Sequence, residues 1–470
     1  MTDVRLYACC ITPEIPAMLL ILGVGLYLTV RLGVPQLVLL PRALRLFFRR
    51  LVSPEKKEGV SSFQALCTAL AATVGTGNLV GVAGAICLGG PGAIFWMWVC
   101  GFLGMATKFS ETALAVRYRV KTPAGFSGGP MYVMTRGLGE KFRPMAKLYC
   151  LFGILAAFGV GNAAQINAVV TGCNGILTRL GGSPGILGNL LLGVGMALAV
   201  GVLLRGGARR VGKTAQLLVP FAAAGYLLMC AVVLLVFRGR IAGAFQAIFT
   251  GAFCPRAVTG GALGSAFSAL QVGCSRGVFT NEAGMGTASI AHAGAENVEP
   301  SEQGLMGIVE VFLDTILICT LTALVILVTG VPIPYGTDVG GALTEAAFAQ
   351  VYGSWAGVLL TAALILFATA TILGWGYYGT RFAAFLWGER GKCRFVAAQS
   401  LAVVLGAVLD TRAVWRLSEV ANGLMAIPNL ICLAALGGEL SRITKEYKNP
   451  ARLAAAGGGK YADFHKRKPL

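Results

Sequence analysis

Long runs of apolar residues, separated by short polar segments, extend along nearly all of the 470-residue chain. A leading run covers about residues 15–30, and ten more lie at about residues 64–85, 90–115, 148–172, 184–204, 212–236, 258–292, 304–330, 354–387, 393–409 and 418–440. A helix needs about 20 residues to cross the hydrocarbon core of a bilayer. The runs do not alternate with a period of two, so they favour helices over a β-barrel. The pattern predicts an all-α polytopic membrane protein of about eleven transmembrane helices.

The composition supports a membrane location. Hydrophobic residues make up 56% of the chain and charged residues only 13%, with a mean hydropathy of +0.74. Soluble domains average about 25% charged residues, so this chain has too few to cover a soluble fold of its size. The 13 cysteines include no C-x-x-C pair, and the chain has only 2 histidines. We therefore expect no zinc site, no cofactor and no catalytic constellation of an enzyme.

The net charge of +19 raises the question of a nucleic-acid partner. The basic residues cluster at Arg42–Lys57, at Lys108–Lys147, at Arg205–Lys213, at Arg381–Arg394 and from Arg442 onward. Hydrophobic passages separate these clusters, so no single basic face forms and a nucleic-acid partner is not expected. With the N-terminus outside, 31 of the 39 Lys and Arg residues fall on the cytoplasmic side, as the positive-inside rule requires. We expect a multi-pass plasma-membrane protein with an outward N-terminus and a cytoplasmic C-terminus.

Two glycine-rich clusters interrupt the apolar runs, T-V-G-T-G-N at Thr73–Asn78 and V-G-C-S-R-G-V-F-T-N-E-A-G-M-G-T at Val272–Thr287. They fall in the first and sixth of the ten runs, the same position in two halves of five helices, 58–236 and 237–445. A leading segment (1–57) and a basic tail (446–470) flank these halves. Close packing is one explanation for such glycines. Polar residues are mixed with them, however, and paired interruptions of this kind indicate the binding site of a secondary transporter.

The chemistry of such a break suits a neutral amino acid. A half-helix that begins after a break offers free N–H groups and a positive dipole end to a carboxylate. A half-helix that ends at a break offers carbonyl groups to an ammonium or to a small cation. A zwitterion can therefore be held without a buried Arg or Asp.

Ionisable residues within the apolar runs are functional candidates, because they are costly in a membrane. Lys108 and Glu111 are three residues apart, which favours an ion pair between them or snorkelling. Arg276 and Glu282 flank the second break, where gating or a hydrogen-bond network is as reasonable as packing support. Asp314 could relay a proton or could have a structural, hydrogen-bonded role.

Seven motifs carry a family resemblance: F-Q-A-L-C-T-A-L-A-A-T-V-G-T-G-N (Phe63–Asn78), G-G-P-G-A-I-F-W-M-W (Gly89–Trp98), G-M-A-T-K-F (Gly104–Phe109), G-G-P-M-Y (Gly128–Tyr132), R-G-V-F-T-N-E-A-G-M-G-T-A (Arg276–Ala288), T-I-L-G-W (Thr371–Trp375) and N-G-L-M-A-I-P-N (Asn422–Asn429). From about residue 15 to 445 the chain resembles the alanine or glycine:cation symporter family. The resemblance implies the leucine-transporter-like fold of the amino acid–polyamine–organocation superfamily, with inverted five-helix repeats and discontinuous first and sixth core helices. It also implies sodium-coupled, or sometimes proton-coupled, uptake of alanine or glycine.

The resemblance also implies a substrate site. The residues carried over are Thr76, Gly77, Asn78, Gln165, Gly273, Cys274, Gly277, Phe279 and Trp375. Those of the first break are expected to meet the substrate carboxylate, with Gln165 projecting toward the same cavity. Gly273, Cys274 and Gly277 are expected to supply backbone around the ammonium, with Phe279 nearby. Trp375 would bound a side-chain pocket small enough to select alanine, glycine or serine.

For the cation, the resemblance implies carbonyl oxygens of Ala72 and Gly75 and a hydroxyl from the eighth span. The family usually reads F-S-T where this chain has Thr369, Ala370 and Thr371, so one expected hydroxyl is missing. Thr371 is expected to bind sodium, and Thr369 could compensate only if the helix were locally distorted.

Together these features predict a secondary active transporter that carries a small neutral amino acid into the cell with sodium, by alternating access. Its expected partners are the amino acid, Na⁺ and the lipid bilayer. Proton coupling is the alternative for the ion, and an amino-acid sensor is an alternative function. A channel would need a pore ring, and the asymmetric halves favour a carrier instead.

Overall fold

The computed structural model describes residues 14–52, 59–123, 125–254, 266–296, 298–410 and 412–448. The first 13 residues, the segment 53–58 and the tail from residue 449 onward lie outside the described residues, and with them the predictions made for the outward N-terminus and the basic cytoplasmic tail. Within the described ranges the chain is helical, apart from loops and an antiparallel pair formed by β1 (Val120–Thr122) and β2 (Gly125–Ser127).

The first half of the chain contains α2 (Glu14–Arg31), α3 (Pro35–Val38), α4 (Leu40–Val52), α5 (Ser62–Thr73), η1 (Gly77–Gly81), α6 (Val82–Gly89), α7 (Gly92–Arg117), α8 (Pro130–Val133), η2 (Met134–Leu138), η3 (Glu140–Phe142), α9 (Arg143–Phe158), η4 (Gly159–Ala163), α10 (Ala164–Arg179), α11 (Ile186–Arg205) and α12 (Gly207–Val236). The second half contains η5 (Arg238–Arg240), α13 (Ile241–Phe253), α15 (Ala266–Asn281), α16 (Thr287–Ala293), α17 (Pro300–Val311), η6 (Phe312–Cys319), α18 (Thr320–Thr329), α19 (Gly341–Tyr352), α20 (Trp355–Val408), α21 (Arg412–Ala435) and α22 (Gly437–Lys448).

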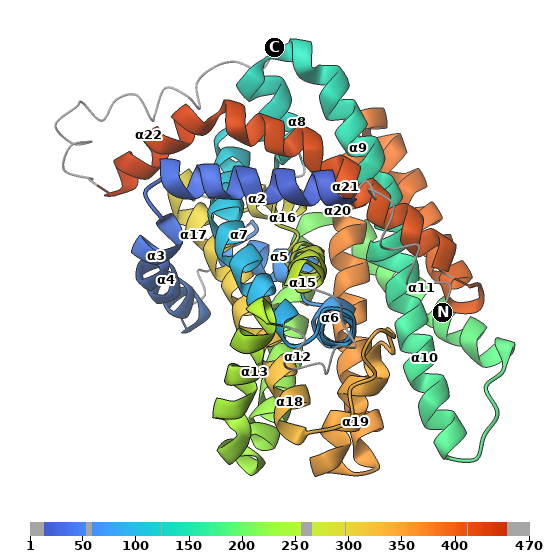
Figure 1. Cartoon of the computed structure of the whole chain (residues 1–470). Coiled ribbons are helices and arrows are strands. Elements are labelled where there is room, and N and C mark those ends of the chain that lie inside the picture. Colours follow the sequence, from blue (N-terminus) through green and yellow to red (C-terminus); the bar gives the residue numbers. More distant parts are fainter. Residues whose placement is uncertain are drawn as a thin grey trace.

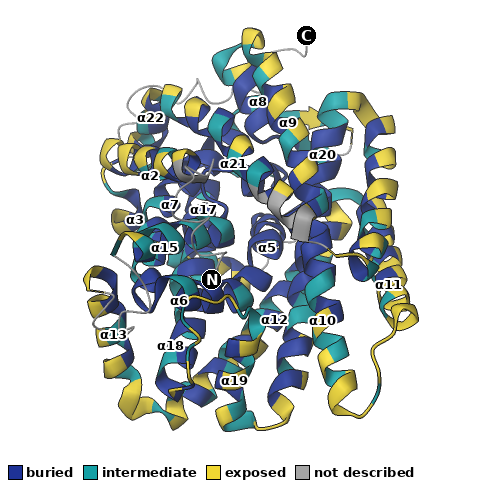
Figure 2. Cartoon of the chain, turned by 45° about the vertical axis from the view of Figure 1, so that its right-hand side comes forward, coloured by how far each residue is buried: buried dark blue, intermediate teal, exposed yellow. Residues whose placement is uncertain are grey.

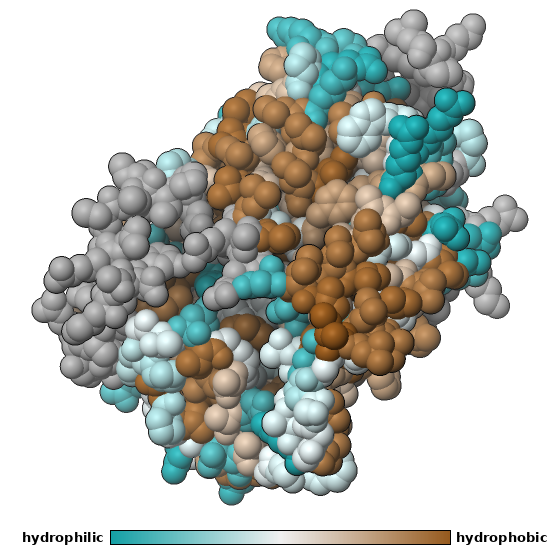
Figure 3. Space-filling view, turned by 90° about the vertical axis from the view of Figure 1, so that its right-hand side faces the viewer, coloured by the Kyte–Doolittle hydropathy of each residue, from teal (hydrophilic) through white to brown (hydrophobic). Residues whose placement is uncertain are grey.

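Six of the described helical segments are long and apolar enough to cross a membrane, or up to eight if each of two bent pairs counts as one span. The 54-residue α20 contains two of the predicted runs, because Gly388 (φ 68°) kinks it at the boundary between them. Large apolar side chains such as Leu191, Leu198 and Phe221 are exposed on the outer surfaces of α11 and α12. Broad apolar areas cover the face of the molecule shown in Figure 3. Exposed apolar surface on this scale suits lipid as the solvent.

The first core helix is broken, as its glycines predict. Ser61 begins it with a capping box, in which its hydroxyl accepts from the N–H of Gln64 at 3.1 Å and its own N–H donates to the Gln64 side chain. The helix α5 ends at Thr73, and the segment Gly77–Gly89 continues at an angle of 50°. In the second half, α15 and α16 are separated by residues 282–286. Figure 1 shows α5, α6 and α15 in the middle of the bundle, and Figure 2 shows that α5 is buried.

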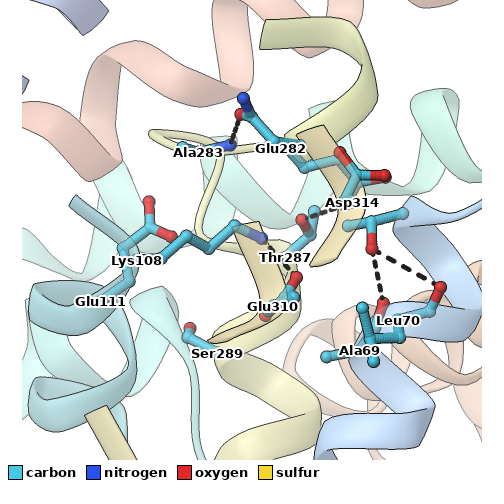
Figure 4. Close-up of polar contacts among 12 residues, drawn as sticks. Ala69, Leu70, Lys108, Glu111, Glu282, Ala283, Thr287, Ser289, Glu310 and Asp314 are labelled. Carbon is cyan, nitrogen blue, oxygen red and sulfur yellow. Dashed lines mark hydrogen bonds and ion pairs between the residues drawn. The ribbon is translucent and has the colours of Figure 1, made fainter. Parts of the chain in front are cut away.

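A buried polar cluster joins α7, α16 and α17 beside the second break. Lys108 Nζ lies 2.8 Å from Glu310 Oε1, and both side chains are wholly buried (Figure 4). The other carboxylate oxygen of Glu310 lies 3.1 Å from His292 Nε2, and Gln303 Nε2 lies 2.8 Å from His292 Nδ1. Lys108 therefore pairs with Glu310 instead of Glu111, which corrects the expectation from their sequence spacing. A buried pair is costly to break by removing one partner, so this cluster fixes how α16 sits against α7 and α17.

Candidate substrate and cation site

Hydrogen bonds of two buried side chains, Asn78 and Asp314, stabilise the first break. Val74 is extended (φ −80°, ψ 102°), which ends α5, and the Gly75 N–H donates to Asn78 Oδ1 at 2.9 Å. Asn78 Nδ2 in turn donates to Asp314 Oδ1 at 2.7 Å, and the Thr315 hydroxyl donates to the other Asp314 oxygen at 2.8 Å. Asn78 and Asp314 are both wholly buried. The amide of Asn78 is thus occupied in shaping the break.

Glycines at the first break allow other helices to approach closely. A Cβ on Gly75 would lie only 2.7 Å from Thr371 Oγ1, on α20. A Cβ on Gly77 would lie 3.1 Å from Cγ2 of Thr280 and 3.5 Å from the Phe279 ring, on α15. Side chains larger than hydrogen would therefore separate the first break from both α15 and α20.

In the second break every other residue has left-handed backbone. Gly284 (φ 95°) and Gly286 (φ 77°) adopt it at little cost, whereas Glu282 (φ 53°) is a non-glycine residue there. Glu111 Oε1, on α7, accepts from the N–H groups of Gly284 at 2.9 Å and Gly286 at 3.1 Å, and from Asn429 Nδ2 at 2.8 Å. Asn429 Nδ2 also donates to the Gly284 carbonyl at 2.9 Å, so side chains of α7 and α21 satisfy buried backbone groups of the break. A strained non-glycine residue such as Glu282 is typical of functional sites.

A small cavity lies where the two breaks meet α20 and the helix α9–η4–α10. It is lined by Ala72, Thr73, Gly75, Gly77, Val160, Gln165, Phe279, Thr280, Glu282, Thr371 and Trp375. Seven residues of the sequence-based site are among them, namely Ala72, Gly75, Gly77, Gln165, Phe279, Thr371 and Trp375. Residues from both halves of the chain therefore converge on one small space.

The structure places three other expected residues away from this cavity. Gly273, Cys274 and Gly277 lie within the regular helix α15, before the break. A Cβ on Gly273 would lie 2.3 Å from the carbonyl oxygen of Ala93, and one on Gly277 would lie 3.0 Å from Cβ of Cys100. These glycines allow α15 to pack tightly on α7, and their carbonyls belong to a helix. The break falls after Asn281, later than these glycines suggested.

Of the two threonines expected at the cation, only Thr371 faces the cavity. Its Oγ1 lies 3.0 Å from the carbonyl oxygen of Phe367 and 3.5 Å from that of Val74, in the first break. Thr369 Oγ1 donates to the Ile365 carbonyl at 2.6 Å, on its own helix, and it is not among the cavity residues. Positions two apart on a helix point about 200° apart, so an undistorted α20 cannot present both.

Thr76 and Gln165 each bury an oxygen that has no hydrogen-bond partner among the described residues. The Gln165 amide nitrogen donates to the Val160 carbonyl at 3.1 Å, which leaves Oε1 open on the cavity side. Thr76 is not among the residues that line the cavity, whereas Gln165 is. Buried polar atoms normally have partners, and the open oxygen of Gln165 in the cavity wall points to a ligand that supplies the partner.

Trp375 bounds the cavity and is fixed on two sides. Its Nε1 donates to Glu282 Oε1 at 2.9 Å. A Cβ on Gly161 would lie 2.4 Å from Trp375 Cβ, so the indole packs directly on the backbone of η4. The width of the cavity at this end therefore depends on Gly161 and on the carboxylate of Glu282.

Sequence reasoning did not include Thr73, Val160, Thr280 or Glu282 among the site residues. Glu282 was singled out only as an ionisable residue beside a break. Its second carboxylate oxygen accepts from the Thr287 hydroxyl at 2.6 Å (Figure 4). The glycine pair around Val160 was an available signal, because Gly159 and Gly161 lie in a π-helical turn that opens α9–α10 toward the cavity.

Arg276, the other charged residue near the second break, makes a contact outside the cavity. Its Nη2 lies 3.2 Å from Asp338 Oδ2, in the loop before α19. A Cβ on Gly84 of α6 would lie 2.9 Å from the same oxygen, so Asp338 sits between α15 and α6. The Arg276–Asp338 ion pair therefore links α6, which follows the first break, to α15, which precedes the second break.

The chain is similar to known transporters over nearly its whole length. The chain is 44% identical over 437 residues to an uncharacterised transporter of Haemophilus influenzae, covering 92% of this chain and 93% of the relative. It is 41% identical over 445 residues to the sodium/alanine symporter AgcS of Methanococcus maripaludis, covering 93% of this chain and 96% of the relative. The crystal structure of MhsT in complex with L-phenylalanine superposes with a TM-score of 0.59 at 12% identity, covering 81% of this chain and 90% of that chain.

The likeness to MhsT confirms the predicted leucine-transporter-like helical fold. Residues 9–457 match the sequence model of the sodium:alanine symporter family, whose members are transporters and not enzymes. The chain belongs to the sodium:alanine symporter family.

Proposed function

We propose that this protein is a secondary active transporter that carries a small neutral amino acid into the cell together with sodium, by alternating access. The observation that carries the proposal is the cavity between the two helix breaks, to which α5, α15 and α20 all contribute side chains or backbone. A site between discontinuous helices can change its exposure when the two repeats move relative to each other. AgcS, the relative named a sodium/alanine symporter, supports the choice of substrate and ion.

The walls of the cavity support a small zwitterion. Phe279 and Trp375 are bulky, and Trp375 is held by Gly161 and Glu282, so a long side chain would have to displace packed groups. The start of η1 at Gly77 offers helix N–H groups to a carboxylate. Alanine, glycine and serine fit these limits.

Oxygen atoms near Thr371 support a cation beside the substrate. The Thr371 hydroxyl and the Val74 carbonyl lie 3.5 Å apart, where α20 meets the first break. Ala72 lines the same cavity. Hard cations such as Na⁺ prefer oxygen ligands, so this is the place that we assign to sodium.

Proton coupling is a second candidate, favoured by one observation. Asp314 is a wholly buried carboxylate that accepts a hydrogen bond from Asn78, the residue that shapes the first break. Protonation of Asp314 would change this hydrogen bond and therefore the conformation of the first break.

Uptake of labelled alanine into proteoliposomes tests the proposal. We expect accumulation when sodium is higher outside, at equal pH and clamped potential, and no accumulation when a proton gradient is imposed without sodium. Accumulation driven by the proton gradient alone would show that the coupling ion is a proton and not sodium. Equilibration that is indifferent to both gradients would contradict symport.

A further inference from the structure

Glu282 is a buried carboxylate in the cavity wall that forms no ion pair with any described residue. The charge of Lys108, on the neighbouring α7, acts on Glu282, but the Lys108 ammonium is itself bound to Glu310 at 2.8 Å. A carboxylate inside a membrane protein is costly, and such residues normally meet a partner or take part in function. A direct cationic partner for Glu282 can come from the contents of the cavity.

Neutral donors fix the orientation of this carboxylate. Trp375 Nε1 donates to one oxygen at 2.9 Å and the Thr287 hydroxyl donates to the other at 2.6 Å. Each carboxylate oxygen can accept two hydrogen bonds, so acceptor capacity remains on both. The structure gives Glu282 these two donors, and an ammonium, with three N–H donors, can occupy the acceptor positions that remain.

A second open acceptor faces the same space. Gln165 Oε1 is buried and has no partner among the described residues, and Gln165 lines the cavity with Glu282. Two acceptors, one on Glu282 and one on Gln165, therefore line one cavity, as the binding of an ammonium needs.

We propose that Glu282 binds the ammonium group of the transported amino acid and so selects ligands that carry a free amino group. This inference rests on the proposed function. It replaces the backbone of Gly273, Cys274 and Gly277, which lies in a regular helix against α7, as the partner of the ammonium. It also balances charge, because a zwitterion and one Na⁺ together with the Glu282 carboxylate leave the filled cavity neutral.

The test combines changes in the protein with changes in the ligand. Glu282→Gln removes the charge but keeps an oxygen for the Trp375 donor, and Trp375→Phe removes that donor but keeps the carboxylate. Glu345→Gln, at a half-buried carboxylate on α19 that pairs with Arg179 and does not line the cavity, is the matched control for the same substitution. Alanine binding is measured on the purified protein at saturating sodium, with L-lactate (hydroxyl in place of ammonium) and propionate as competitors.

We expect the parent protein and Glu345→Gln to bind alanine and to ignore lactate and propionate. Glu282→Gln should bind alanine about 30-fold more weakly or worse, the effect of about 2 kcal/mol for a lost buried charge partner. Trp375→Phe should still prefer alanine to lactate strongly, because the carboxylate remains. Glu282→Asp, which keeps the charge on a shorter side chain, should also retain this preference. If Glu282→Gln does not fold, Glu282→Asp is used in its place to test the inference.

Three outcomes would overturn the inference. One is alanine affinity in Glu282→Gln within threefold of the parent. The second is an unchanged alanine affinity with a shifted sodium dependence, which would assign Glu282 to the ion. The third is equal loss of ammonium preference in Glu282→Gln and Trp375→Phe, which would make Glu282 only a positioning residue for the indole. Absence of sodium-dependent binding of alanine, glycine and serine to the parent protein would overturn the proposed function itself, and the inference with it.

Discussion

Replacing Asn78 with alanine should damage substrate binding although the Asn78 side chain does not line the cavity. The change removes the acceptor of the Gly75 N–H at 2.9 Å and the donor to Asp314 at 2.7 Å. Both groups would remain buried, and each unmet buried polar group costs about 1–3 kcal/mol. The total of about 2–6 kcal/mol is a large share of the ~5–15 kcal/mol stability of a typical domain. We expect a clearly lower unfolding temperature and loss of most alanine affinity.

The assay is thermal unfolding of the purified protein with and without alanine, together with alanine affinity at saturating sodium. Asp314→Asn keeps an oxygen acceptor for Asn78 and should cost less than Asn78→Ala. Asn189→Ala, on α11 and outside the cavity, is the control and should behave like the parent. If Asn78→Ala unfolds at the parent's temperature and binds alanine with the parent's affinity, Asn78 does not shape the first break.

Three further predictions concern packing, charge movement and the missing hydroxyl. Gly161→Ala places a Cβ 2.4 Å from Trp375 and should weaken alanine binding by about 1–3 kcal/mol, whereas Gly175→Ala, with no atom within 4 Å of the new Cβ, should bind alanine normally. Uptake should be electrogenic, since one cation moving with a zwitterion gains about 2.3 kcal/mol per 100 mV, so current recorded with alanine should rise as the interior is made negative. Ala370→Ser should lower the sodium concentration for half-maximal uptake. Gly374, one turn away on α20, packs on Ala72 of α5, so a hydroxyl at position 370 would also face α5. A sodium titration at fixed pH and potential checks this last point.

Sequence patterns predicted the two breaks well but could not place the second one accurately. Glycines at 273 and 277 look the same in sequence whether they open a helix or let it pack on a neighbour. The structure shows that they pack on α7, and that the chain leaves α15 only at Glu282. The left-handed turn there depends on Glu111 and Asn429, which come from α7 and α21. Contacts so distant along the chain are not visible in local spacing.

The same limit applies to the buried charges. Spacing suggested Glu111 for Lys108, but the partner is Glu310, 202 residues away. Glu282 was noticed as a charge in a membrane span, yet its place in the cavity wall depends on how α15 and α20 meet. By contrast, Thr371 and Trp375 lie one helical turn apart in a recognisable motif, and both line the cavity. Residues within a local motif could be predicted, whereas those brought together by tertiary packing could not.

The most direct test of the account is a sodium titration of alanine uptake in the parent, Thr371→Ala and Thr369→Ala, at fixed pH and membrane potential. The Thr371 hydroxyl faces the first break, while that of Thr369 donates to its own helix at 2.6 Å. We therefore expect Thr371→Ala to lose sodium stimulation and Thr369→Ala to titrate like the parent. A Thr371→Ala protein that titrates like the parent would contradict the sodium site at the cavity between the two breaks.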